Sequence, residues 1–201
     1  MTRTPPPART PDGTSGRPPG RPRAGLDAEV FTATLNTVHE LGYARATVER
    51  IAAVAGIAKS TIYRRWPSKG ALIVDCLLDA FGPVPLKDGA DRAELMASTI
   101  RWIAATIGER GVGDAFAGVF SDAVSDPALR GILSTRLQDP YRLALQDALD
   151  EPEQRVLFFI DVVVGTMLHR MGMTGEPMVD ADVDALVAMV LPHFADGAGP
   201  A

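Results

Sequence analysis

Several features that often reveal a protein's chemistry are scarce or absent from this sequence. Among 201 residues only Cys76 is a cysteine, which excludes an internal disulfide, and its apolar neighbours predict a small buried side chain. The strongest apolar run, residues 156–168, contains Asp161 and falls short of the ~20 residues of a membrane span. The N-terminus lacks the apolar core of a signal peptide. We therefore expect a cytoplasmic protein that has no membrane partner.

Residue patterns typical of enzymes are also missing. The three histidines, His39, His169 and His193, are far apart and have no carboxylate partners at metal-ligand spacing. No Gly-x-Ser-x-Gly motif, phosphate-binding loop or dinucleotide fingerprint occurs. The sequence predicts neither catalysis nor a metal or organic cofactor.

What is present is a strong asymmetry of charge. Residues 1–70 hold 11 Lys and Arg against 5 Asp and Glu, a net charge of +6, whereas residues 71–201 hold 9 against 20, a net charge of −11. A basic front on an acidic body indicates a polyanionic partner at the front only. The acidic body would repel that partner and so orient the protein.

Helical signals divide residues 26–81 into four short helices. Apolar side chains recur at helical spacing from Asp27, a candidate cap, to Leu41, and a second helix starts at Thr47, which can also serve as a cap. The remaining signals are a turn at Gly56, a short helix over about 58–65 that points Ile62 inward, and Ser68 as the cap of a helix over 68–81.

The segment from Thr47 to Trp66 has the pattern of a helix-turn-helix. Ala52 is small enough for two helices to cross, and Gly56 permits a tight turn between them. The apolar side chains that would hold the pair together are Val48, Ile51, Val54, Ile57 and Ile62. In such a motif the second helix enters the major groove of DNA.

The exposed side of the short helix after Gly56 would make the DNA contacts. Lys59, Ser60 and Thr61 can meet base edges, because Lys bonds guanine and hydroxyls bond several bases. The residues better suited to phosphate are Thr47, Tyr63, Arg64 and Lys69. The solvated face of an ordinary helical hairpin carries the same residue types, so spacing alone leaves that alternative open.

Residues 27–81 resemble the DNA-binding domain of TetR-type (TetR/AcrR) transcriptional regulators. The matching words, over about a quarter of the chain, are Thr47-x-x-x-Ile51-Ala52, Ala55-Gly56-Ile57, Thr61-Ile62-Tyr63 and Pro67-Ser68-Lys69-x-x-Leu72. The resemblance implies a homodimer on roughly palindromic double-stranded operator DNA. It also implies that helix 58–65 reads bases and that Thr47, Tyr63 and Lys69 grip phosphate. In one departure, Ala58 replaces the usual serine, so this helix lacks an N-cap typically worth ~1 kcal/mol.

The N-terminal tail carries a second DNA-related signal. Residues 1–25 contain 7 Pro and 4 Gly and almost no large apolar side chains, which predicts disorder. Within this tail, Gly20-Arg21-Pro22-Arg23 resembles the core of an AT-hook, which lies in the minor groove of A·T tracts. A solvated linker is the alternative. An intermediate hypothesis is that Arg17, Arg21 and Arg23 add nonspecific attraction near the operator.

A second helical domain is predicted after the breaker Gly82-Pro83-Val84-Pro85, over residues 86–196. Its apolar stripes cover about 91–107 and 116–124, and the pairs Asp126-Pro127, Asp139-Pro140 and Glu151-Pro152 predict helix starts. Residues 156–173 are apolar almost all round, which predicts burial on more than one side, and the last helix covers about 181–194. No strand alternation occurs. The predicted fold is all-α, with a three-helix helix-turn-helix domain followed by a helical domain.

The C-terminal domain is predicted to bind a ligand and to dimerise. His169-Arg170 and Thr174-Gly175-Glu176-Pro177 resemble the end of one group of TetR-type domains, and this implies that helices 152–173 and 181–194 pair with their copies in a four-helix bundle. A pocket for an unknown small-molecule effector would lie between the middle helices. Its candidate lining residues are Trp102, Phe116, Phe120, Tyr141, Phe158, Phe159, Met167, Met171 and His169, although such stripes also build an ordinary core.

Together these patterns favour a repressor that a small-molecule effector releases from DNA. Helix 68–81 would connect the pocket to the DNA-binding domain. One alternative is an effector-independent regulator or activator that keeps the dimer. The other is a small-molecule-binding or enzymatic helical protein whose helix-turn-helix is incidental. Asp161, in an otherwise apolar helix, would pair with an arginine or face the dimer axis.

Overall fold

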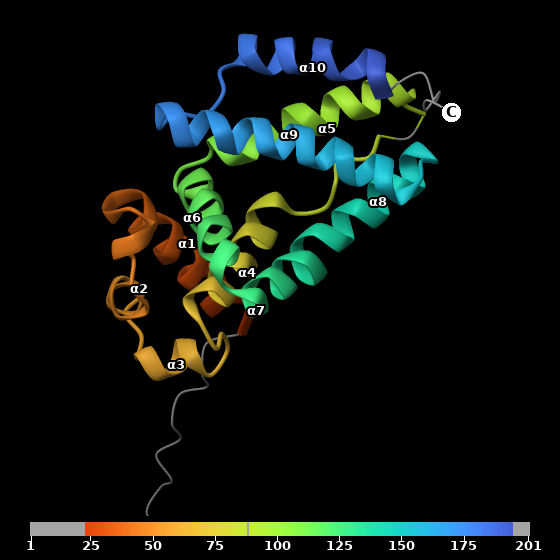
Figure 1. Ribbon diagram of the computed structural model, residues 1–201. Coiled ribbons are helices and arrows are strands. Elements are labelled where there is room, and N and C mark those ends of the chain that lie inside the picture. The colour runs from red at the N-terminus through yellow and green to blue at the C-terminus, as the bar shows by residue number, and fades with distance from the viewer. Residues whose placement is uncertain (1–22, 88, 195–201) are drawn as a thin grey trace, which may run out of the picture.

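The computed structural model describes residues 23–87 and 89–194, and within them the regular secondary structure is entirely helical, with no strand. The elements are α1 (Arg23–Leu41), η1 (Tyr43–Arg45), α2 (Val48–Val54), α3 (Lys59–Tyr63), α4 (Lys69–Phe81), α5 (Arg92–Gly108), α6 (Val112–Ser125), α7 (Pro127–Ile132), η2 (Leu133–Gln138), α8 (Asp139–Leu149), α9 (Glu153–Thr174) and α10 (Asp180–Phe194). Figure 1 shows α2 and α3 at one end and α5, α9 and α10 at the other. The all-α prediction is confirmed.

Side-chain caps fix several helix starts. The Thr47 hydroxyl accepts a hydrogen bond from the Arg50 amide at 3.4 Å, and the Ser68 hydroxyl accepts one from the Ala71 amide at 3.1 Å. These are the two caps predicted for α2 and α4, each typically worth ~1 kcal/mol. The Ala58 side chain offers no cap to α3, as expected.

Two clusters of buried apolar side chains build the core, and α4 belongs to both. Leu72 and Cys76 of α4 pack with the residues of α1, α2 and α3, whereas Ile73 and Leu77 pack with α5 and α6. Cys76 is fully buried, as predicted, and burial raises the pKa of its thiol. The breaker after Phe81 therefore ends a helix but does not separate two independent cores.

Two details of the predicted DNA-binding domain were wrong. Helix α1 begins at Arg23, so Asp27 lies inside it, and the Asp27 carboxylate pairs with the Arg65 guanidinium instead of capping the helix. Val54 is 61% exposed rather than part of the apolar face. Successive steps of three residues drift about 60° each around a helix, so Val54 has left the face on which Val48 and Ile51 lie.

The pair Asp139-Pro140 does not start a separate helix. Helices α7 and α8 are joined without a break by η2, a turn of π-helix. Pro140 has no backbone N–H and its ring crowds the preceding turn, so a widened turn is a common way to keep such a helix continuous. Asp126-Pro127 does start a helix, with the Asp126 carboxylate accepting from the Leu129 amide at 3.1 Å.

Helix α9 is more exposed in the single chain than its composition predicts. Its buried residues are Val156, Phe159, Val163 and Met167, all on one face. Contrary to expectation, α9 is long and apolar enough to cross a membrane by length and composition, with a mean hydropathy of 1.5 over its best window. Only 22% of that window is buried. Core helices of globular proteins pass the same test when they are mostly buried, and an exposed apolar surface of this kind marks a site of contact with protein or membrane.

Candidate DNA-binding helix, cavity and interdomain contact

The turn before α3 directs this helix out of the domain. Gly56 has a φ of +65°, a conformation that residues with a Cβ seldom adopt, and the Ile57 amide donates to the Ala52 carbonyl at 3.0 Å to close the turn. Ile62 is 1% exposed and anchors α3 on the core. The opposite side of α3 is thereby turned towards solvent.

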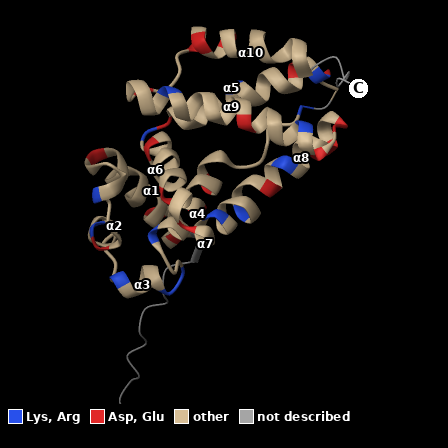
Figure 2. Ribbon diagram, viewed as in Figure 1, with Lys and Arg blue, Asp and Glu red and all other residues tan. Residues whose placement is uncertain are grey.

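The residues predicted to contact DNA gather on this outer side. Lys59, Ser60, Tyr63 and Arg64 are exposed, Thr61 is half-buried, and Thr47 is exposed at the start of α2. Lys59 is the only Lys or Arg within α3, and Figure 2 shows a basic segment on α3 at this end of the molecule. The individual DNA contacts of these residues stay predictions.

An acidic residue that the sequence analysis did not single out shares this surface. The Lys59 ammonium forms an ion pair with the Glu49 carboxylate of α2 and lies 5.3 Å from the centre of the Tyr63 ring. The hydrogen bond from Lys59 lowers the pKa of Glu49 to about 2. In the free protein the charge of Lys59 is thus balanced within the domain, and a DNA phosphate would have to compete with Glu49.

Lys69 also has partners inside the protein. Its ammonium donates to the Tyr43 carbonyl at 3.0 Å and lies 3.6 Å from the centre of the Tyr43 ring. Desolvation by burial lowers the pKa of Lys69. The predicted phosphate contact of Lys69 stays a prediction, and it requires the ammonium to leave or share these contacts.

Tyr43 joins the DNA-binding domain to α6 of the second domain. Its hydroxyl donates to the Asp122 carboxylate at 2.7 Å, and burial is the main cause that raises the pKa of the phenol. A Cβ placed on Gly118 would lie 2.0 Å from Cγ of Tyr43, so only glycine admits the ring here. We call Tyr43, Lys69, Gly118 and Asp122 the Tyr43 contact. Because 79 residues separate Tyr43 from Asp122, no local pattern could have revealed it.

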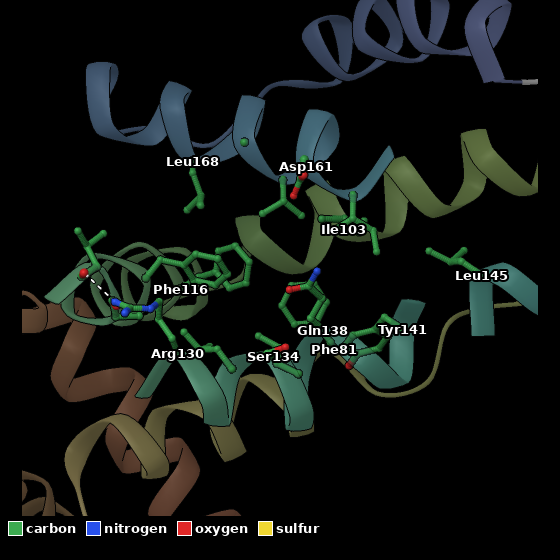
Figure 3. A pocket seen from close by; sticks show the side chains of 18 of the residues that line it. Phe81, Ile103, Phe116, Arg130, Ser134, Gln138, Tyr141, Leu145, Asp161 and Leu168 are labelled. Carbon is green, nitrogen blue, oxygen red and sulfur yellow. Dashed lines mark hydrogen bonds between the residues drawn. The ribbon is translucent and has the colours of Figure 1, made fainter. Parts of the chain in front are cut away.

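A cavity of about 520 Å³ lies between α5, α6, the α7–α8 helix and α9. Its aromatic lining consists of Phe81, Trp102, Phe116, Phe120 and Tyr141, whose rings contact one another in tilted or edge-to-face pairs with centroid separations from 4.7 to 6.1 Å. The polar lining residues are Arg130, Ser134, Gln138 and Asp161 (Figure 3). Four of the predicted pocket residues, Trp102, Phe116, Phe120 and Tyr141, therefore meet around one cavity.

Other predicted pocket residues do not line this cavity. Phe159 and Met167 are 1% and 2% exposed and belong to the core, and His169 is exposed outside the lining. The face of α9 towards the cavity carries Ile160, Val164 and Leu168, one position on from Phe159, Val163 and Met167. One residue rotates a side chain by about 100° around a helix, so the sequence stripe was placed on the wrong face. Phe158 and Met171 are likewise absent from the lining.

The arginines of the predicted tail fall mostly outside the described residues. Arg17 and Arg21 lie there, so their predicted role near the operator is not addressed, and Arg23 is the first residue of α1. Within the described part of the chain, no group of three His, Cys, Asp or Glu side chains could hold a metal ion.

Family models match both domains. Residues 30–76 match the model of bacterial regulatory proteins of the tetR family, and residues 88–190 match that of tetracyclin repressor-like C-terminal domains. The second match alone covers slightly more than half of the chain.

Whole-chain relatives and a solved structure agree with these models. An uncharacterized HTH-type transcriptional regulator of Mycobacterium tuberculosis is 27% identical over 189 residues, which are 89% of this chain and 92% of the relative. The DNA-binding transcriptional repressor TetR of Mycobacteroides abscessus is 29% identical over 174 residues, 82% of this chain and 90% of the relative. The crystal structure of the TetR family transcription regulator SCO0332 matches with a TM-score of 0.59 and 27% identity, over 87% of this chain and 99% of that one. With its helix-turn-helix and its helical second domain both matched, the chain belongs to the TetR family and is a transcriptional regulator.

Proposed function

We propose that this regulator is a homodimeric repressor whose two α3 helices bind operator DNA about one helical turn, ~34 Å, apart, and that a small molecule in the cavity releases it. TetR family regulators bind operator DNA and act as dimers with small-molecule effectors. One relative, that of Mycobacteroides abscessus, is named a repressor. The proposed role is binding without catalysis, in the cytoplasm.

One observation carries the release mechanism for this chain: α6 touches both the cavity and the DNA-binding domain. Phe116 and Phe120 line the cavity, and Gly118 and Asp122, on the same helix, hold Tyr43. A ligand that displaces either phenylalanine would shift α6 and with it Tyr43. Helix α4, which packs in both cores, supports a second connection through Phe81, another cavity residue.

The proposed dimer interface is the exposed apolar surface of α9 and α10. Phe158, Met173 and Met189 are 60%, 71% and 70% exposed. Figure 2 shows both helices largely free of charged residues. Exposed apolar side chains of this kind are unfavourable in water, and pairing with a second copy would bury them in a four-helix bundle.

The dimer is tested with Met189→Glu. A buried carboxylate without a partner costs several kcal/mol, so we expect the dimer to dissociate and operator affinity to fall at least tenfold. Sedimentation velocity measures the mass and a gel shift measures the affinity. The matched control is Leu143→Glu on α8, another exposed apolar residue, 56% exposed but outside α9 and α10. An unchanged dimer in Met189→Glu would refute this interface.

The release mechanism is tested with the DNA upstream of the protein's own gene. Compounds that raise the melting temperature are collected first, because a ligand that binds the folded state stabilises it. We expect these compounds to weaken the DNA complex about 5- to 150-fold, the usual range of allosteric coupling. Compounds that bind the cavity and leave operator affinity unchanged would show that the regulator is independent of effectors.

A further inference from the structure

The two charged residues that line the cavity are not equivalent. The Arg130 side chain is committed within the protein, because Nη1 donates to the carbonyls of Ala123 at 2.7 Å and Val124 at 2.8 Å. These carbonyls belong to the C-terminal end of α6, where a cation is favoured by the helix dipole. The arginine thus ties α7 to α6 through Nη1, whereas Nε and Nη2 of its exposed guanidinium make no hydrogen bond among the described residues.

Asp161 has no such partner. Among the described residues, no donor or cation lies within hydrogen-bond or ion-pair distance of its carboxylate. Figure 3 places Asp161 on α9, on the opposite side of the cavity from Gln138, with Arg130 at one end. The other α9 residues of this wall are Ile160, Val164, Gly165 and Leu168, and none of them has a polar side chain. Asp161 is exposed, so its unpaired carboxylate is in contact with solvent while it borders a largely apolar cavity.

The aromatic lining favours the same sign of ligand charge. The rings of Phe116 and Phe120 lie 4.7 Å apart, and those of Trp102 and Tyr141 lie 5.6 Å apart. Ring faces are electronegative and attract cations. The Tyr141 hydroxyl donates to the Gly82 carbonyl at 2.9 Å, so its proton is not available to an anion.

The acidity of the second domain adds a long-range contribution. Residues 71–201 carry a net charge of −11, which raises the local concentration of cations and lowers that of anions. An anionic ligand would be repelled by Asp161, by the ring faces and by the negative charge of the domain. Of the two charged lining residues only Arg130 would favour it, and Nη1 of Arg130 is already bonded to two carbonyls.

We propose that the cavity binds a lipophilic organic cation, with Asp161 as the counter-charge and the aromatic rings enclosing the apolar groups. This inference rests on the proposed function in one respect, that the cavity is the effector site. Ser134 and Gln138 are uncharged, so they do not distinguish a cationic ligand from an anionic one, whereas the Asp161 carboxylate does.

The test uses two probes of nearly the same shape and opposite charge, tetraphenylphosphonium and tetraphenylborate. Calorimetry measures their binding to the full-length wild type, Asp161→Asn and Asp147→Asn, where Asp147 is an exposed carboxylate of α8 outside the cavity lining. We expect the wild type to prefer the phosphonium by at least about tenfold. Asp161→Asn should remove most of that preference and Asp147→Asn should not. Sedimentation velocity shows whether the variants keep the mass of the wild type.

Each of the other possible results contradicts the cation site, the role of Asp161 or the release mechanism. Tighter binding of the borate, or no binding of either ion, rejects the cation site, and the proposed function stands or falls separately on operator release by other compounds. An Asp161→Asn variant that changes its mass but not its affinity for the phosphonium assigns Asp161 to the dimer interface and rejects its role here. Charge-selective binding that leaves the operator complex intact upholds the cation site and refutes the proposed release mechanism.

Discussion

Replacing both Lys59 and Tyr63 with alanine is expected to lower operator affinity about 100-fold. The base-edge contact predicted for Lys59 is worth about 1–3 kcal/mol, and the phosphate contact predicted for Tyr63 adds to it, so together their loss amounts to about two orders of magnitude. The structure adds a reason for a large effect, because Lys59 neutralises Glu49. Without the lysine, an unpaired carboxylate would face the phosphates of the operator. A gel shift at fixed salt measures the affinity, since salt alone changes it strongly.

A further substitution at Glu49 tests whether the unpaired carboxylate causes part of the loss in operator affinity. Adding Glu49→Gln to the double variant removes the repulsion and should recover part of the affinity. The matched control is Lys87→Ala, which also breaks an exposed Lys–Glu pair, with Glu94 at 2.9 Å, but lies away from α3. We expect that control to bind normally. Normal operator binding by a folded Lys59→Ala, Tyr63→Ala protein would contradict the assignment of α3 as the DNA-binding helix.

The helix-turn-helix could be predicted because its determinants are local. Thr47 caps α2 and Gly56 makes the turn, and both act on neighbours within a few residues; the helical spacing around Ile62 likewise shows which side of α3 faces inward. Short-range backbone and packing preferences decide each of them, so a single sequence contains the information. The same holds for Ser68 and Asp126, whose side chains bond amides two or three residues ahead.

The cavity and the interdomain contact depend on packing between distant segments. Helix α9 carries two neighbouring apolar faces, one that includes Met167 and one that includes Leu168. The sequence of the helix does not indicate which of the two faces packs in the core and which lines the cavity. Only the position of α6 and the α7–α8 helix decides it. The packing of distant helices also places Asp161 and Arg130 in the cavity lining, which the sequence did not predict. Pro140 predicts a break in the chain's helix, but the π-helical turn before it keeps the helix continuous.

Gly118→Ala is expected to disrupt the Tyr43 contact. The new Cβ would lie 2.0 Å from Cγ of Tyr43, so the ring must leave and with it the hydrogen bond to Asp122. Overpacking typically costs about 1–3 kcal/mol, which lowers the melting temperature by roughly 2–4 °C for each kcal/mol in a chain of this size. The control, Gly131→Ala in α7, meets no atom within 4 Å and should be neutral or slightly stabilising.

The cause of this loss can be isolated with a second substitution at Tyr43. In a Tyr43→Ala background the space beside Gly118 is free, so Gly118→Ala should cost almost nothing further, and the two changes should be strongly non-additive. Tyr43→Phe keeps the ring and removes only the hydrogen bond to Asp122, typically worth about 1 kcal/mol. If the contact also transmits the state of the cavity, the Tyr43→Ala protein should bind the effector normally but release its operator less. Additive unfolding free energies would show that the ring and the methyl group do not compete for one space, and normal release would place the connection in α4 instead.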